Sequence, residues 1–173
     1  MSDLILSERN LITGMGAALV DLFADVEEPA LDALGSPKGS MTLVDAARAD
    51  ALRAGVKVHT YRPGGSAANT VAGLAGLGMQ GGFIGKIGDD ELGRVFQDSL
   101  TDLGVAFPVT PCDSAEHPTG NCLVLVTPDA ERTMHTLLGA SVTTAMVDLD
   151  AKLLNATGIL FCEGYVWDLS LIH

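Results

Sequence analysis

The segment RPGGSAANTVAGLAGLG, from Arg62 to Gly78, carries the strongest local pattern in this chain of 173 residues. Two adjacent glycines lead into small and apolar residues that recur at i, i+3, i+4 and i+7 from Val71, which predicts a helix from about Ser66 to Leu77. Because glycine has no Cβ, a ligand can approach such a main chain closely. Taken alone, however, the motif fits a tight turn before a buried helix better than a ligand site.

The helix start supplies groups that could hold a ligand. The first amides of a helix have no partner within it and can donate to hydroxyl groups or anions. Asn69 falls in the first turn, where its side-chain amide can both donate and accept. This combination suits a polyhydroxylated ligand.

Composition and charge narrow the classes of function. Hydrophobic residues make up 47% and charged residues 18%, as in a soluble globular protein of one ordinary domain. The formal net charge of −12 argues against partners that are nucleic acids or anionic membranes, because both need a positive surface. A phosphorylated ligand needs only local positive groups.

Cysteine usage and the termini point to a cytoplasmic protein. The three cysteines, Cys112, Cys122 and Cys162, are odd in number and have no C-x-x-C spacing, so a disulfide framework is not expected. The start MSDLILSERN lacks the basic region and the long apolar run of a secretory signal. The uncharged run from Pro63 to Gly85 is better explained by a buried helix and a strand than by a membrane span.

The remaining chain alternates between strand and helix patterns, which predicts a parallel α/β sheet. A hairpin, with a turn at Thr127 to Glu131, and an exposed strand do not fit a plain doubly wound order and suggest a small accessory sheet. The expected strands are 10–26 (turning at Gly14 and Gly16), 56–62, 81–88, 105–109, the hairpin 121–138, and a buried strand from 158 to 163. The expected helices are 43–54 and 92–103, with a helix or an irregular turn at 148–155.

The opening segment is followed at once by GFIGKIGDDELGRVF. Together they resemble the N-terminal signature of the ribokinase (PfkB) family of carbohydrate and nucleoside kinases. There a GG-x-x-x-N segment leads into a small-residue helix, and a G-x-x-G-D-D-x-x-G segment, here Gly85 to Gly93, follows. GMGAALVDL, PTGNCLVLVTPDAERTM and CEGYVWD resemble further family segments, and the likeness is strongest to bacterial adenosine-kinase-like members.

The resemblance implies an α/β fold with a central, mostly parallel sheet flanked by helices and a small β lid. Residues 1–173 would form the N-terminal, substrate-binding part of the kinase domain, with lid segments near 22–62 and 106–138. The family's C-terminal half would be absent. A homodimer through the lid is a further implication, because family members often dimerise there.

The resemblance also implies site residues. Asp21 is similar to an aspartate that binds sugar hydroxyls, and a carboxylate is well suited to accept two hydroxyl protons. The ribose-binding segment corresponds to Gly64, Gly65, Ser66 and Asn69. Each residue also has a structural alternative, such as an ordinary acid at the end of a strand.

Three further positions resemble residues around the substrate. Glu163 resembles an acid close to the substrate end of the site. Arg132 resembles an arginine of the returning lid strand that approaches the transferred phosphate or the substrate. Cys122 resembles a lid position that faces a nucleobase. Ala17 and Ala18 stand where nucleoside-specific relatives often have an asparagine, which leaves sugars open as substrates.

Catalysis in this family requires a G-A-G-D segment, whose aspartate is the base and whose amides form an anion hole. The chain stops at DLSLIH without it, so the resemblance implies that the catalytic aspartate would lie beyond His173. We therefore expect no catalytic residue in this chain, a chain inactive by itself, and a last strand left as a sheet edge. ATP and Mg²⁺ would act in the full-length enzyme, and this portion alone would bind neither.

Two other interpretations remain open. A dinucleotide-binding oxidoreductase is disfavoured, because Leu19 replaces the third glycine after Gly14 and Gly16. A non-catalytic module that binds a sugar or nucleoside, or only assembles, is the main alternative. We expect no metal site, because no histidine has ligand-like spacing to cysteines or acids. The histidines are His59, His117, His135 and His173.

Overall fold

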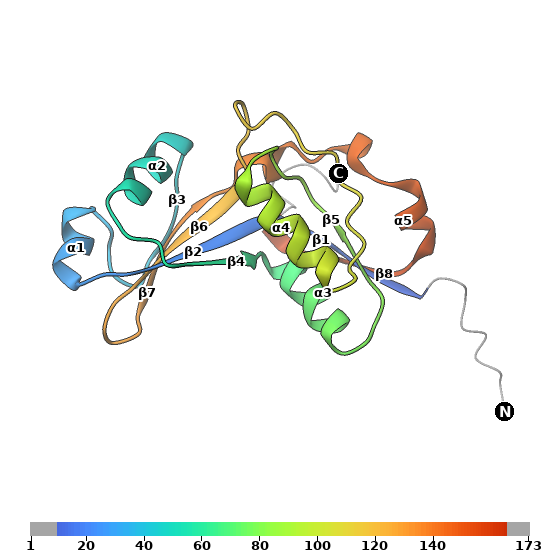
Figure 1. Cartoon of the computed structure of the whole chain (residues 1–173), viewed down its shortest axis with the longest axis horizontal. Helices are drawn as coiled ribbons and strands as arrows, with labels where there is room; N and C mark the ends of the chain where they lie inside the picture. The colour runs from blue at the N-terminus through green and yellow to red at the C-terminus, as the bar shows by residue number, and fades with distance from the viewer. Residues whose placement is uncertain (1–9, 166–173) are drawn as a thin grey trace.

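The computed structural model describes residues 10–165, which form two sheets (Figure 1). The base sheet is parallel throughout, in the order β5-β1-β8, and the lid sheet has the order β3-β7-β6-β2-β4. The base strands are β1 (Leu11–Met15), β5 (Gly81–Ile84) and β8 (Thr157–Cys162). The lid strands are β2 (Leu19–Asp25), β3 (Met41–Leu43), β4 (Thr60–Gly64), β6 (Gly120–Val126) and β7 (Arg132–Leu137).

Helices cover both faces of the base sheet. On one face, α3 (Ser66–Gly76) packs so closely on β1 that a Cβ at Gly14 would lie 2.9 Å from the Ala67 carbonyl oxygen. On the other face, Leu153 of α5 (Ala151–Ala156) packs against Met15 and Ile84. The predicted sheet flanked by helices is therefore confirmed.

One hydrophobic core runs from the base into the lid. Phe83, Phe96 of α4 (Glu91–Asp102) and Phe107 form a cluster with ring centroids 5.3–5.6 Å apart. The same core includes Val20 and Leu123 of the lid strands. Because the two sheets share this core, the lid strands are anchored where they leave the base.

The two faces of the lid sheet differ. Side chains of β2 alternate between buried and half-buried, and two short helices, α1 (Glu28–Ala33) and α2 (Ala46–Ala54), bring Leu31 and Leu52 into the core with the buried set. Asp21 belongs to the other set, and its partners in the neighbouring strands are Arg62 and Cys122. The second face therefore carries the candidate site residues of the lid.

Two expectations about strands were wrong. Residues 105–109 form no strand, and the segment makes a single isolated bridge, from Ala106 to Gly82; a second bridge, from Cys112 to Gly88, follows it. The strand expected to be buried, β8, is exposed, with 60% of Ile159 and 40% of Phe161 accessible. The physical reason is that β8 pairs only with β1 among the described residues, so its apolar sequence lies at a sheet edge.

Most of the other expected elements are present, although the exposed strand expected at 56–62 lies at Thr60–Gly64, and α1 and β3 were not expected. The hairpin of β6 and β7 is confirmed, and α2 begins after Asp45, whose side chain caps the amide of Arg48. The uncertain segment 148–155 contains α5, which follows two 3-10 helices, Gly139–Thr143 and Met146–Asp148. No helix within residues 10–165 combines the length and the apolar character needed to cross a bilayer.

Both ends of the chain lie outside the described residues. These ends are the MSDLILSER start and residues 166–173, which include the DLSLIH segment and its last residue, His173. The structure therefore does not test what the sequence analysis inferred there. That the catalytic aspartate of the whole enzyme would lie beyond His173 stays a prediction.

Candidate functional site

The glycine pair is required by its surroundings. A Cβ at Gly64 would lie 2.7–2.8 Å from the Asp21 carboxyl group. Gly65 has φ +93°, a region that disfavours side chains, and a Cβ there would lie 2.4 Å from the Ala17 carbonyl oxygen. At Gly65 the contact is with backbone, so only glycine lets the main chain pass the β1–β2 turn, whereas a side chain at Gly64 would displace the Asp21 carboxyl group.

The Asp21 carboxylate lies directly against the first glycine and is half-buried on β2. Burial raises its pKa, and the positive charge of Arg132 partly opposes that rise. No hydrogen bond contributes to the shift. Among residues 10–165 no donor forms a hydrogen bond with this partly desolvated carboxylate, so with respect to those residues its oxygens can accept hydrogen bonds from a ligand.

Glu163, in contrast, is satisfied by the protein itself and only 4% exposed. Its carboxylate accepts hydrogen bonds from the Ala17 amide at 2.6 Å, the Ser66 hydroxyl at 2.7 Å and the Ala67 amide at 3.2 Å. A Cβ at Gly16 would lie 2.4 Å from its carboxyl carbon. Glu163 therefore ties the end of β8 to the β1–β2 turn and to the first turn of α3.

The other candidate residues surround the glycine pair and the two carboxylates of Asp21 and Glu163. Ser66 and Asn69 are exposed on the first turn of α3, and Cys122 is buried beside Asp21 in the strand register. The Cys122 thiol accepts a hydrogen bond from Thr136 at 3.3 Å, and burial raises its pKa to about 11. Arg132, exposed at the start of β7, acts on Asp21 through its charge.

Contacts therefore join most of the candidate set. Gly64, Gly65 and Ser66 lie between the two carboxylates, and Cys122 is next to one of them. Within residues 10–165 the Asn69 side chain has no hydrogen-bond partner that would join it to the group. The roles of all eight residues in substrate binding stay predictions.

The β1–β2 turn is the part that the sequence did not reveal. The Ala17 amide donates to Glu163, and the Ala18 amide donates to the Ser141 hydroxyl at 3.0 Å. Alanines carry no recognisable signal, because only their backbone is used. The one available hint was Gly16, since a glycine between two strand patterns marks a close approach.

The second glycine motif, Gly85 to Gly93, is explained by packing and helix capping. Asp90 caps α4 by accepting from the Gly93 amide, and its other oxygen accepts from the Thr119 amide, both at 2.8 Å. A Cβ at Gly93 would lie 2.2 Å from the Gly88 carbonyl oxygen. The motif thus holds α4 against the loop that leads into the lid.

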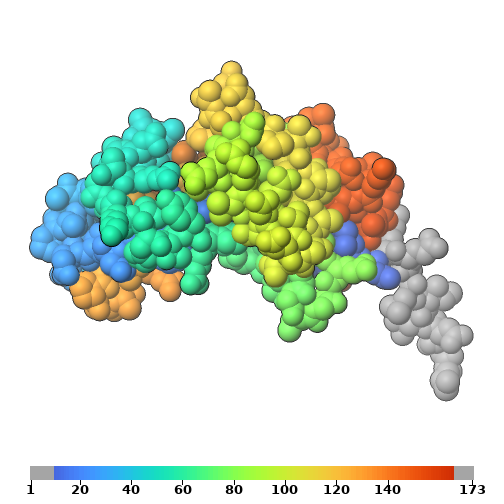
Figure 2. All heavy atoms as spheres, in the orientation of Figure 1, coloured from blue at the N-terminus to red at the C-terminus, as the bar shows by residue number. Residues whose placement is uncertain are grey.

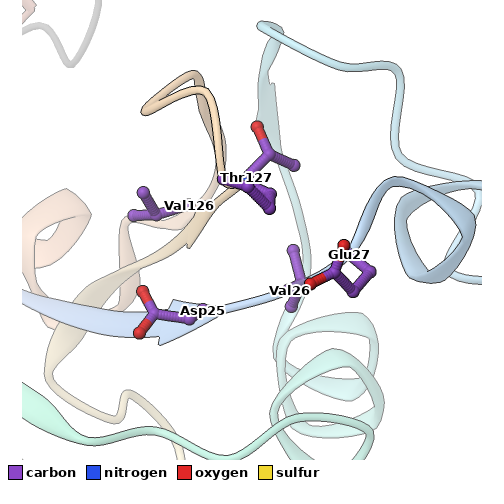
Figure 3. A pocket seen from close by; sticks show the side chains of 6 residues that line it. Asp25, Val26, Glu27, Val126 and Thr127 are labelled. Atoms are coloured by element: carbon purple, nitrogen blue, oxygen red, sulfur yellow. The ribbon is translucent and has the colours of Figure 1, made fainter.

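Neither of two cavities found among the described residues is lined by the candidate residues. One has a volume of about 190 Å³ and lies between the end of β2, at Asp25 and Glu27, and the turn at Val126 and Thr127 (Figure 3). The other, of about 450 Å³, lies beside the part-buried Lys86–Asp148 ion pair. The candidate residues instead lie where the lid strands leave the base, between the lid elements on the left of Figure 2 and the base elements on its right.

The described part of the chain offers no metal centre. No group of three or more histidine, cysteine, aspartate or glutamate side chains within residues 10–165 could hold an ion. His173 lies outside that range.

The comparisons with known proteins agree on one family. Residues 40–171 match the pfkB family of carbohydrate kinases. The fold superposes on adenosine kinase from Sinorhizobium meliloti with a TM-score of 0.82 and 36% identity, covering 92% of this chain and 49% of that one. A probable sugar kinase from Rhizobium etli gives the same TM-score at 33% identity, with 92% and 48% coverage.

A curated relative matches over a shorter region. The 5-dehydro-2-deoxygluconokinase of Halalkalibacterium halodurans is 44% identical over 57 residues, which are 33% of this chain and 17% of that protein. The chain spans about half the length of the two kinase structures. Since the family match covers well over half of this chain and the fold agrees with it, the chain belongs to the pfkB family of carbohydrate kinases.

Proposed function

We propose that this chain supplies the substrate site and lid of an ATP-dependent kinase that phosphorylates a hydroxyl of a sugar or an adenosine-like nucleoside. The observation that carries the proposal is the Asp21 carboxylate, which lies against the backbone of Gly64 and makes no hydrogen bond to another residue of the described range 10–165. An unsatisfied carboxylate beside bare main chain is a receptor for neighbouring hydroxyls.

Each of these residues would contact the ligand according to its hydrogen-bonding chemistry. Asp21 accepts hydrogen bonds from two ligand hydroxyls, while the amides of Gly65 and Ser66 and the side chain of Asn69 donate to ligand oxygens. Cys122 forms part of the wall beside Asp21. These contacts hold the acceptor hydroxyl in place, which is the main contribution of a protein to phosphoryl transfer.

The lid would exclude water when a ligand is bound. Its strands leave the base at the β1–β2 turn and at the glycine pair, so a small rotation there moves the open face of the lid sheet toward α3. Arg132 on that face would approach the ligand on closure. Excluding water favours transfer to the substrate over hydrolysis of ATP.

The kind of substrate follows from two observations that point in different directions. Similarity to an adenosine kinase over most of the chain favours a nucleoside. Ala17 and Ala18, together with the similarity to a probable sugar kinase, keep sugars in the proposal. ATP, Mg²⁺ and the catalytic base belong to the proposed whole enzyme, of which this chain matches about half. A homodimer through the lid also stays a proposal, and α1 and α2 already cover one face of the lid sheet.

Titration calorimetry with adenosine, ribose and fructose tests the proposal. We expect one of them to bind the wild-type chain and the Asp21→Asn variant to lose that binding. Asp25→Asn is the matched control, because Asp25 lies on the same strand and face but its side chain is 80% exposed. Equal affinity of wild type and Asp21→Asn would contradict the proposed role.

A parallel assay with Mg²⁺-ATP tests whether this chain is catalytic by itself. Binding with no phosphorylated product is the expected result, and it is compatible with both functional candidates. Product formation would contradict the expectation that the chain is inactive alone and would exclude the non-catalytic module.

A further inference from the structure

The first turn of α3 already holds an anion that belongs to the protein. The helix begins after Gly65 and has no side-chain cap from its own segment. Glu163, from a distant part of the chain, takes that position: one carboxylate oxygen accepts from the Ser66 hydroxyl and the Ala67 amide, and the other accepts from the Ala17 amide. With 4% of the residue exposed, the carboxylate is shielded from solvent.

An internal anion changes what the site can bind. The N-terminus of a helix attracts anions such as phosphate through its free amides and its dipole. Here the Ala67 amide is occupied, and a second anion would be repelled by a buried charge that water screens poorly. Asp21, across the glycine pair, adds a second negative charge on the other side. Uncharged hydroxyl groups are not repelled by these charges, and they can donate hydrogen bonds to a carboxylate without needing the Ala67 amide.

We propose that Glu163 restricts this site to uncharged acceptors, such as nucleosides and unphosphorylated sugars, and disfavours sugar phosphates and sugar acids. The inference rests on the proposed function and specifies the substrate class of the same site. Glu163 acts in it as a positioning and specificity-determining residue, since its oxygens are engaged by the protein.

The cations near the site do not offset this effect. Arg62 pairs with Asp21 in the strand register, and Arg132 already acts on the Asp21 charge. Both side chains are exposed on the lid, where water and salt weaken their attraction for a ligand. The buried carboxylate is screened less, so it dominates the selection.

Calorimetry with a neutral and two anionic ligands tests the selectivity. We expect wild type to bind ribose or adenosine at least about tenfold more tightly than ribose 5-phosphate or gluconate. In Glu163→Gln, which keeps the size but removes the charge, this ratio should fall by about tenfold. A purely structural role would weaken all ligands alike and leave the ratio unchanged. Asp150→Asn, at the cap of α5, is the control and should not alter the ratio.

Two results of that titration overturn the inference. One is wild type binding an anionic ligand as tightly as the neutral one. The other is anionic binding that disappears in Arg132→Gln, which would assign selection to the lid arginine. If no ligand of either charge binds, the proposed function fails, and the following experiment still decides the role of Glu163.

Anion rescue tests the internal anion without any substrate. Glu163→Ala leaves a space of carboxylate size beside the Ala17 and Ala67 amides, so formate should raise its melting temperature more than chloride at equal ionic strength. Wild type should show no such difference. If the variant is too unstable to melt cooperatively, its refolding yield in formate and in chloride gives the same comparison. Equal effects of the two salts on the variant contradict the inference.

Discussion

Two carboxylates lie on opposite sides of one glycine pair, and they differ in burial and in hydrogen bonding. Glu163, on the base side, is buried and accepts three hydrogen bonds. Asp21, on the lid side, is half-buried, has no hydrogen bond that shifts its pKa, and has its pKa raised by burial. The difference teaches that two carboxylates close together in one fold can be held in different ways: the first is engaged by the protein, whereas the second is partly desolvated and lies beside a positive charge.

The largest expected effect comes from placing a side chain on the backbone between the two carboxylates. Gly65→Ala places a Cβ 2.4 Å from the Ala17 carbonyl oxygen at φ +93°, so we expect a loss of about 3–5 kcal/mol in the free energy of unfolding. Denaturant titration measures it. Gly76→Ala is the control, because nothing lies within 4 Å of its Cβ, and it should be neutral or slightly stabilising. Equal behaviour of the two variants would contradict the close approach.

Removing the base-side carboxylate should have the next largest effect. Glu163→Ala leaves the amides of Ala17 and Ala67 without an acceptor, so we expect a loss of about 2–4 kcal/mol in the free energy of unfolding. Thermal or chemical denaturation provides the measurement. A change below about 0.5 kcal/mol would show that the carboxylate does not stabilise the first turn of α3.

Removing the lid-side carboxylate should lower ligand affinity without lowering the stability of the fold. Asp21→Asn should lower ligand affinity by about ten- to a hundredfold, the range for hydrogen bonds to a charged group. Because the folded-state pKa of Asp21 is raised, its ionisation opposes folding as the pH rises, and the variant should be as stable as wild type or slightly more stable at pH 7. Calorimetry and melting temperature together check both statements. A clear loss of stability would make Asp21 a structural residue like Glu163.

The smallest expected effect concerns the covered face of the lid. His135 is 4% exposed, its Nε2 lies 2.7 Å from the Ser36 hydroxyl, and its Nδ1 has no partner within the described residues. Burial, and then the Arg48 charge, lower its pKa. The unfolded chain therefore takes up the proton first, and stability should fall as the pH drops below about 6.5.

The variant His135→Gln isolates this contribution. The difference in unfolding free energy between wild type and variant should change between pH 7.5 and pH 5 by about 1 kcal/mol or less. His59→Gln, at an exposed position on the lid, is the control. A wild-type profile that runs parallel to that of His135→Gln would contradict a neutral, buried histidine.

Much of the fold was predictable because local patterns are strong. The helical spacing after the glycine pair, the hairpin with its turn at Pro128, and the apolar stripe of α4 are all set by residues close in sequence. The expected strand at 105–109 failed because its backbone meets the base sheet at one isolated bridge only. The apolar pattern of β8 predicted a buried strand, because such a strand has the same pattern at an edge as in a centre. Its place at a sheet edge was expected only from the resemblance to the family, whose C-terminal half would supply the next strand, and the sheet order agrees with that expectation.

For the site, the glycine pair and Asp21 were predicted through resemblance to a family, and the structure places them in contact. The engagement of Glu163 was not predictable. Its partners are the backbone amides of two alanines and the hydroxyl of one serine, up to 146 residues away. Every residue except proline has a backbone amide, so the sequence does not show which amides will bind a side chain.

The sequence by itself determined the helices, the hairpin, the two glycine motifs and the class of fold, because these depend on spacing and turn chemistry between near neighbours. Only the tertiary structure decided which of two carboxylates is satisfied and which is free. That outcome depends on which donors the sheets bring within about 3 Å of each oxygen, and strands far apart in the chain supply them.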